Sequence, residues 1–146
     1  MAGERPIVRS IFDLPTHLIS PDDSVRLAGL AGPPHGSSAS VFLEIWEPGG
    51  SQPFNSHAES AEVFIVIRGE AIAHSDQEEV RLKTGDILVL QPGSQHRIVN
   101  TSPSNRLYTI TVMADDGGFW DLVTRGTTVA LEHQDLDVLV ATSESA

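Results

Sequence analysis

Three side chains in the middle of the chain, His57, Glu62 and His96, have the types and spacing of a metal site. Asn55 and His57 are two positions apart, so on an extended strand their side chains point the same way. Glu62 follows after a short bend, and His96 lies beyond a later turn. Two imidazoles and one carboxylate that meet on neighbouring strands favour a divalent transition metal with open coordination positions. The spacing therefore predicts a metal face made by His57, Glu62 and His96.

The elements that would position these residues are short extended segments separated by turns. Residues 40–46 alternate in the manner of a strand and end at Pro48-Gly49-Gly50. Further segments of this kind are 62–68, 71–75, 78–82, 87–90, 96–100 and 107–113, with 71–75 and 78–82 expected to pair as a hairpin around Asp76-Gln77. Short strands at such even spacing predict an all-β sandwich or barrel. Residues 118–124 have some helical character, and residues 135–140 are expected to form a short helix or a strand.

The length and charge of the chain limit its organisation and its partners. With 146 residues it has room for one domain, which we divide into an N-terminal arm with edge strands (1–35), a core (36–115) and a C-terminal extension (116–146). The formal net charge of −11 argues against a nucleic-acid partner and against an anionic membrane surface, because both bind cationic proteins. With no cysteine in the chain, any metal must be held by nitrogen and oxygen ligands.

Two expectations concern location and assembly. The first residues, Met1 to Pro6, lack the apolar core of a secretion signal, and no segment has the apolar length of a membrane span, so we expect a cytoplasmic protein. The proline-punctuated N-terminal arm suits strand exchange with a second copy, so we also expect a homodimer.

The central segment resembles the cupin superfamily. The first cupin motif, G-x5-H-x-H-x3,4-E-x6-G, is similar to the pattern formed here by Gly49, Asn55, His57, Glu62 and Gly69. The second, G-x5-P-x-G-x2-H-x3-N, is matched at Gly85, Gly93, His96 and Asn100, with Gln91 at the usual proline. Residues 70–84 separate the two motifs, a length similar to that of compact single-domain members.

This resemblance implies a double-stranded β-helix, or jelly-roll barrel, with a pocket at one mouth and a metal inside. In metal-binding members three histidines and one glutamate hold the ion. The carried-over ligands are His57, Glu62 and His96, with Asn55 as a substitute where the first histidine would stand. The cofactor implied is Fe, Mn, Ni or Zn. An amide oxygen is a poorer ligand than imidazole for Zn, Ni or Fe, although it is acceptable to Mn.

Two functions are compatible with this pattern. The first is a metal-dependent enzyme that acts on a small oxygenated metabolite by isomerase, lyase or oxygenase chemistry, through Lewis-acid or Fe/O2 activation. The second is a non-catalytic cupin that binds a small molecule, with or without metal. The His57, Glu62 and His96 set favours the enzyme, whereas Asn55 and the absence of a second clear acid–base residue favour the binding protein.

The direction in which the side chains of one strand point decides whether a further candidate catalytic residue is present. Glu44 and Trp46 share a face that points either inward or to solvent. If it points inward, Glu44 is a candidate general base and Trp46 a pocket wall. We expect the outward arrangement, because Val41, Leu43 and Ile45 on the other face make the better core.

The remaining histidines and two arginines receive less specific interpretations. His17, His35 and His133 are expected in solvated loops, and His74, on a short strand, is a minor candidate to line the pocket. Arg97 and Arg106 flank the second motif. Either one would meet an anionic substrate if it lay at the barrel mouth, but we expect both at the solvated surface.

Overall fold

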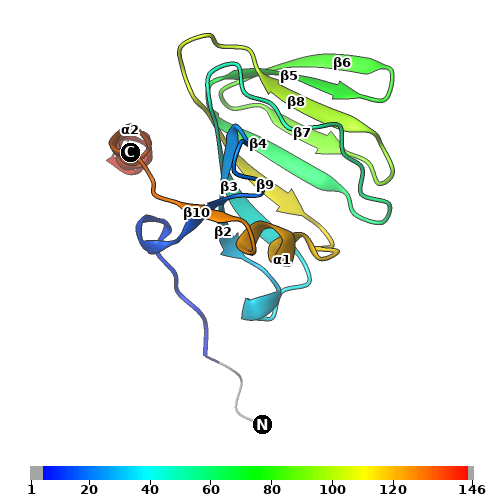
Figure 1. Cartoon of the computed structure of the whole chain (residues 1–146). Coiled ribbons are helices and arrows are strands. Elements are labelled where there is room, and N and C mark those ends of the chain that lie inside the picture. The colour runs from blue at the N-terminus through cyan, green and yellow to red at the C-terminus, as the bar shows by residue number, and fades with distance from the viewer. Residues whose placement is uncertain (1–4, 145–146) are drawn as a thin grey trace.

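The computed structural model describes residues 5–144 and is built mainly from antiparallel strands (Figure 1). The strands are β1 (Thr16–Leu18), β2 (Val25–Ala31), β3 (Ser40–Trp46), β4 (Glu62–Arg68), β5 (Glu70–Ser75), β6 (Glu78–Lys83), β7 (Ile87–Leu90), β8 (His96–Asn100), β9 (Leu107–Met113) and β10 (Thr127–Val129). The helical elements are η1 (Ile11–Asp13), η2 (Pro33–His35), α1 (Phe119–Thr124) and α2 (His133–Glu144). No helix among residues 5–144 has the length and apolar character needed to cross a bilayer.

The strands form two sheets. The larger has the order β10-β1-β2-β3-β9-β4-β7, and the smaller has the order β6-β5-β8. From β4 to β9 the chain passes repeatedly between the sheets, because β4, β7 and β9 belong to the larger and β5, β6 and β8 to the smaller. This arrangement confirms the expected all-β fold, including the β5–β6 hairpin at the upper right of Figure 1.

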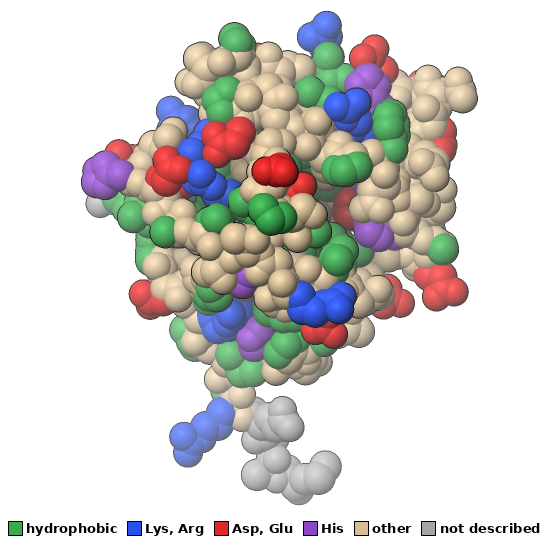
Figure 2. All heavy atoms as spheres, in the orientation of Figure 1, with side chains coloured by type: hydrophobic (Ala, Val, Ile, Leu, Met, Phe, Trp, Pro, Cys, Tyr) green, Lys and Arg blue, Asp and Glu red, His purple; other side chains and the backbone are tan. Residues whose placement is uncertain are grey.

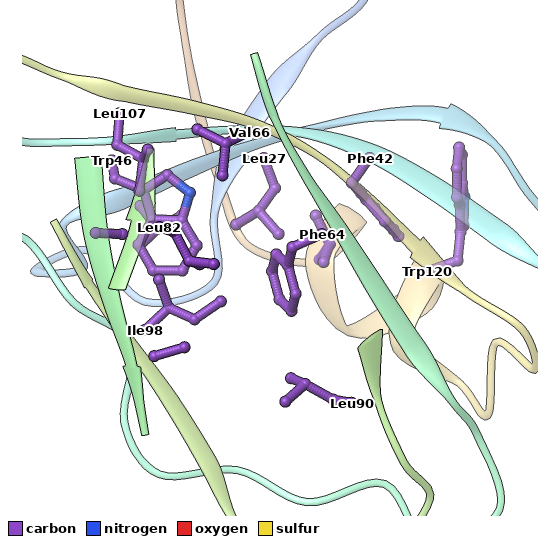
Figure 3. Close-up of a cluster of buried hydrophobic side chains, with 14 residues drawn as sticks. Leu27, Phe42, Trp46, Phe64, Val66, Leu82, Leu90, Ile98, Leu107 and Trp120 are labelled. Atoms are coloured by element: carbon purple, nitrogen blue, oxygen red, sulfur yellow. The ribbon is translucent and has the colours of Figure 1, made fainter. Parts of the chain in front are cut away.

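The main hydrophobic core fills the space between the two sheets (Figure 3). Phe64 lies centrally in this view, between a group that includes Trp46, Leu82 and Ile98 and another that includes Phe42. The indole N–H of Trp46 donates to Thr109 Oγ1 at 3.1 Å, so this polar atom is satisfied inside the core. Large apolar side chains from both sheets thus hold the sheets together.

Strand β3 corrects the expected direction of Glu44 and Trp46. Both side chains point into the molecule, and their residues are 4% and 0% exposed, so the outward prediction is wrong. The opposite face of β3 is also buried, because Leu43 and Ile45 pack in a second cluster with Leu139 of α2. A strand covered on both faces gives no polar–apolar alternation from which its inward side can be read.

The segment before residue 36 supplies β1 and β2 to the larger sheet; its first four residues lie outside the described part of the chain. Strand β2 lies between β1 and β3, and β10 rather than β1 occupies that edge of the sheet. His17 lies on β1 and is 8% exposed, so its expected place in a solvated loop is wrong. The division into arm, core and extension stays a prediction.

The turn before α1 is fixed by its own side chains. Asp116 accepts hydrogen bonds from Gly118 N and Trp120 N, and so satisfies free N–H groups at the start of the helix. Trp120 then packs against β2, where Gly29 leaves it room: a Cβ on Gly29 would lie 2.5 Å from the Trp120 ring. Helix α1 confirms the helical character expected for residues 118–124.

Helix α2 is held by a buried ion pair. Asp135 is fully buried and accepts from Arg106 Nη1 at 2.9 Å, from the Tyr108 hydroxyl at 2.8 Å and from Glu132 N at 2.9 Å. Arg106 also contacts Glu47 at 3.1 Å. The expectation of a solvated Arg106 is therefore wrong, because its charge is neutralised by carboxylates of the C-terminal segment that meet it only in the folded chain.

On the face of the molecule in Figure 2, lysine and arginine side chains lie singly or beside acidic ones and form no continuous basic patch. This distribution agrees with the excess of 20 acidic over 9 basic side chains in the chain.

Replacing Asp135 with alanine is expected to destabilise the protein by about 1–3 kcal/mol, since it leaves the buried Tyr108 hydroxyl without its acceptor and removes one of the three carboxylates that contact Arg106. Urea unfolding followed by circular dichroism measures the change. Asp137→Ala is the control, because its side chain is 68% exposed and its pair with His133 is worth about 0.5 kcal/mol or less. Equal stability of the two variants would contradict this role of Asp135.

Candidate metal centre

Backbone pairing positions two of the candidate ligands at the junction of the sheets. Glu62 begins β4 of the larger sheet, where it pairs with Met113 and Leu90. His96 begins β8 of the smaller sheet. Asn55 lies in the loop between β3 and β4 and forms an isolated bridge with His96, in which each backbone N–H donates to the other residue's carbonyl at 2.9 and 2.8 Å.

His57 lies in the same loop rather than on a strand. Its carbonyl accepts a hydrogen bond from Gly93 N at 2.8 Å, within the turn that precedes β8. Gly93 adopts a φ of 84°, which glycine reaches without strain. The turn glycine of the second motif thus fixes the backbone of a ligand from the first motif.

The structure brings the side chains of His57, Glu62 and His96 together. Their ligand atoms all lie within 4.8 Å of one another. His57 Nε2 lies 3.3 Å from Glu62 Oε2, and His96 Nε2 lies 3.4 Å from Glu62 Oε1. Two imidazole nitrogens therefore face the two oxygens of one carboxylate, which is the arrangement that a 2-His-1-carboxylate metal site requires.

The hydrogen bonds of His96 indicate which of its nitrogens is free to bind an ion. Its Nδ1 lies 3.2 Å from the carbonyl oxygen of Ser94, so Nδ1 carries the proton and donates it there. Nε2 is buried and makes no hydrogen bond within residues 5–144. With Nδ1 protonated, Nε2 directs a lone pair toward the site. This pattern is the usual support for a histidine that binds metal.

Among the three candidate ligands, Glu62 is the one whose charge must be stabilised in the interior, because it is only 5% exposed. Burial acts to raise the pKa of this carboxyl, but the adjacent imidazoles of His57 and His96 outweigh burial and lower the pKa below its ordinary value of 4.5. Glu62 is thus held as a carboxylate, and positive charge beside it is what stabilises it.

Asn55 lies beside the group in a defined orientation. Its Oδ1 accepts from Ser56 N at 2.8 Å, which places Nδ2 toward His57 Nε2 at 3.2 Å. An amide nitrogen has no lone pair available for a metal. A ligand role for Asn55 stays a prediction, and it requires the amide to rotate so that Oδ1 faces the group.

A cavity of about 420 Å³ opens beside His57 and Asn55. It lies between the start of β2, β3, the loop 51–57 and the turn into α1. Most of its wall is apolar, and its polar members include Glu44. Sequence patterning did not identify the α1 side chains Phe119 and Leu122 as part of this wall, because a short helix outside the motifs gives no functional signal.

Like Asp116, whose oxygens accept hydrogen bonds from N–H groups at the start of α1, Glu44 is a buried acid in the wall of this cavity. Burial raises the pKa of its carboxyl to about 8, and the nearby Glu62 charge adds to this effect. Its Oε2 has no hydrogen-bond partner within the described chain. With its pKa raised in this way, Glu44 is mainly protonated at pH 7, where it is a proton donor rather than the general base expected for the inward alternative.

The other histidines lie away from this group. His74 lies on β5, is not part of the cavity wall, and has its Nδ1 3.9 Å from Glu79. His35 is half-buried in η2, where its Nδ1 accepts from Gly32 N, so its expected solvation is wrong. His133 is exposed as expected, although it begins α2 rather than lying in a loop.

Comparisons with known proteins agree with this geometry. The family model described as "Cupin domain" matches residues 42–113, which contain all four candidate ligands. The oxalate-binding protein of Thermotoga maritima is 32% identical over 54 residues, which are 37% of this chain and 45% of that protein. The match thus spans less than half of this curated relative.

Solved structures share the fold. The structure of a predicted oxalate decarboxylase from Thermotoga maritima has a TM-score of 0.63 at 24% identity, covering 74% of this chain and 97% of that one. An RmlC-like cupin from Shewanella frigidimarina has a TM-score of 0.63 at 14% identity, covering 75% and 90%. An oxalate oxidase in complex with glycolate has a TM-score of 0.58 at 16% identity, covering 67% and 54%.

The raised pKa of Glu44 predicts a stability difference that depends on pH. Because the folded pKa of about 8 exceeds the ordinary value of 4.5, the unfolded chain releases this proton first as pH rises. Wild-type stability should therefore fall relative to Glu44→Gln through that window, by about 2–3 kcal/mol from about pH 5 to about pH 7.5.

Denaturant unfolding of both proteins in EDTA measures this difference without a contribution from metal. Glu78→Gln is the control, because Glu78 is exposed on β6. A constant difference between wild type and Glu44→Gln across this range would show that Glu44 is ionised in the folded protein.

Proposed function

Because this chain belongs to the cupin superfamily, we propose that His57, Glu62 and His96 hold a divalent transition metal, to which a small oxygenated molecule binds from the adjoining cavity. Fe, Mn, Ni and Zn all accept this set of imidazole and carboxylate ligands.

The observation that carries the proposal is the arrangement around His96. Its Nδ1 is engaged with Ser94, so the buried Nε2 directs a lone pair toward an oxygen of the Glu62 carboxylate 3.4 Å away. Two electron-rich atoms at this distance repel each other unless a proton on the imidazole or a metal cation lies between them. A metal ion satisfies both atoms, together with His57 on the other side of the carboxylate.

The residues of the chain have distinct roles in this proposal. When bound, the metal supplies a Lewis acid that polarises a ligand carbonyl or stabilises an enolate. His57 and His96 orient the site through their backbone ties to Gly93 and Asn55. Glu44 holds a proton inside the same cavity and exchanges it with the bound molecule. The apolar wall excludes water from that exchange.

We propose a class of ligands and reactions rather than a single substrate. Relatives are named for oxalate binding, oxalate decarboxylation and oxalate oxidation, so molecules with adjacent oxygens are the natural first ligands to test. The chemistry proposed for this chain is isomerase, lyase or oxygenase chemistry on such a molecule.

A second candidate function is a non-catalytic cupin that binds a small molecule. The orientation of Asn55 favours it, because Nδ2 rather than a metal-binding atom faces His57. The name of the oxalate-binding relative also favours it. The homodimer and the cytoplasmic location stay predictions.

Metal titration of the full chain tests the proposal. After treatment with EDTA and removal of the chelator, the protein should bind one equivalent of Mn, Ni or Zn by calorimetry. His96→Ala should weaken binding about 100-fold or more, because it removes one of three ligands. His74→Ala is the matched control, since His74 lies outside the ligand group. Equal affinities for wild type and His96→Ala would contradict the site.

Asn55→His provides a gain-of-function variant for the same measurement. It places an imidazole where Nδ2 now faces His57, so Zn and Ni should bind about tenfold or more tightly than in wild type. Unchanged affinity would show that position 55 does not reach the metal.

A further inference from the structure

We propose that the ligand of this site binds the metal through oxygens at one end and carries an uncharged apolar body, without a second negative charge, at the other end. This inference rests on the proposed function, because the metal fixes the oxygen-bearing end. It concerns what the rest of the cavity accepts.

The cavity has the size and the lining for such a body. Its volume of about 420 Å³ exceeds what a molecule as small as oxalate occupies. The wall includes aliphatic and aromatic side chains from several elements, which are Ile19, Val25, Leu27, Phe54, Leu122 and Phe119, and the ring of Phe119 packs edge-on against that of His57. An apolar body placed there removes apolar surface from water on both sides.

The charged groups of the cavity disfavour an anion there. Among residues 5–144 its wall contains no lysine or arginine, and its acidic members are Asp23, Glu44 and Asp116. Asp116 is buried and its oxygens are already engaged by the backbone N–H groups of α1. A second carboxylate in this space would meet the like charges of Asp23 and Asp116 and would lose its hydration with no cation in the wall to compensate it.

One basic side chain at the rim, Arg97, is engaged by two residues of the wall. Arg97 lines a separate shallow hollow that shares Asp23, Ser51 and Phe54 with the main cavity. Its guanidinium donates to Ser51 Oγ at 3.0 Å and lies over the Phe54 ring, 5.8 Å from the ring centroid. The Arg97 guanidinium is thus committed to Ser51 and Phe54 at the rim, and Arg97 is not one of the residues that line the cavity.

Two ligands with the same metal-binding end can show whether the cavity prefers an apolar body or a second negative charge. 4-Methyl-2-oxopentanoate and 2-oxoglutarate both present a 2-oxo acid to the metal, but the first ends in an isobutyl group and the second in a carboxylate. Calorimetry on the full chain loaded with one equivalent of Ni(II) should show the first binding about tenfold or more tightly. Oxalate, measured in parallel, should show no advantage over 4-methyl-2-oxopentanoate.

A charge-inserting variant tests the cause of this preference. Leu122 lies on α1 in the cavity wall and is 44% exposed, so Leu122→Arg brings a cation to the cavity with little disturbance of the core. This variant should reduce the preference about tenfold by binding 2-oxoglutarate more tightly. Val80→Arg is the matched control, because Val80 is 41% exposed on β6 and lies outside the cavity wall.

The two proposals fail in different ways. Loss of Ni(II) from the wild-type protein on gel filtration contradicts the proposed metal site, and the ligand inference with it. Retained Ni(II) with equal or tighter binding of 2-oxoglutarate or oxalate contradicts the ligand inference alone. Retained Ni(II) with no binding of either 2-oxo acid also contradicts it. An unchanged preference in Leu122→Arg would show that charge in the cavity is not its cause.

Discussion

The buried carboxylate of Glu62 is the constraint on which the rest of the site depends. An ionised carboxylate that is 5% exposed is costly unless positive charge lies beside it. Its two oxygens face the Nε2 atoms of His57 and His96, and the Nδ1 proton of His96 is committed to Ser94. A cation shared by these three residues meets the electrostatic requirement of the carboxylate and the ligand requirement of the imidazoles together.

The location of this group relates the site to the stability of the fold. Glu62 belongs to the larger sheet, His96 belongs to the smaller sheet, and His57 comes from the loop that is tied to the turn before β8. An ion bound by all three would join the two sheets at one end. Because it would bind the folded chain and not the unfolded one, its binding free energy would add to the stability of the protein. The hydrophobic core between the sheets is the second link between them.

The sequence predicted the parts of this structure that depend on local patterns. The expected strands, the β5–β6 hairpin and α1 follow from β-rich runs and turn residues, and the spacing of His57, Glu62 and His96 predicted that they meet. Asn100, the last residue of the second motif, has a structural role. Its buried amide donates hydrogen bonds to three backbone carbonyls and fixes the end of β8.

The features that escaped prediction depend on contacts between distant segments. Glu44 faces inward because helix α2 covers the other side of β3, and no local pattern reveals that cover. Arg106 is buried because Asp135 meets it from 29 positions along the chain. His17 reads locally as a loop residue, yet pairing of β1 with β2 and β10 buries it. In each case the contacting segment is too far along the chain to affect the short stretch of sequence from which a local pattern is recognised.

Anomalous scattering from a crystal grown with Zn(II) or Mn(II) tests the central claim most directly. The account predicts one strong peak about 2.0–2.3 Å from the Nε2 atoms of His57 and His96 and from a Glu62 oxygen. The absence of a peak between these three side chains, in crystals whose anomalous map shows the metal bound elsewhere, would contradict the account.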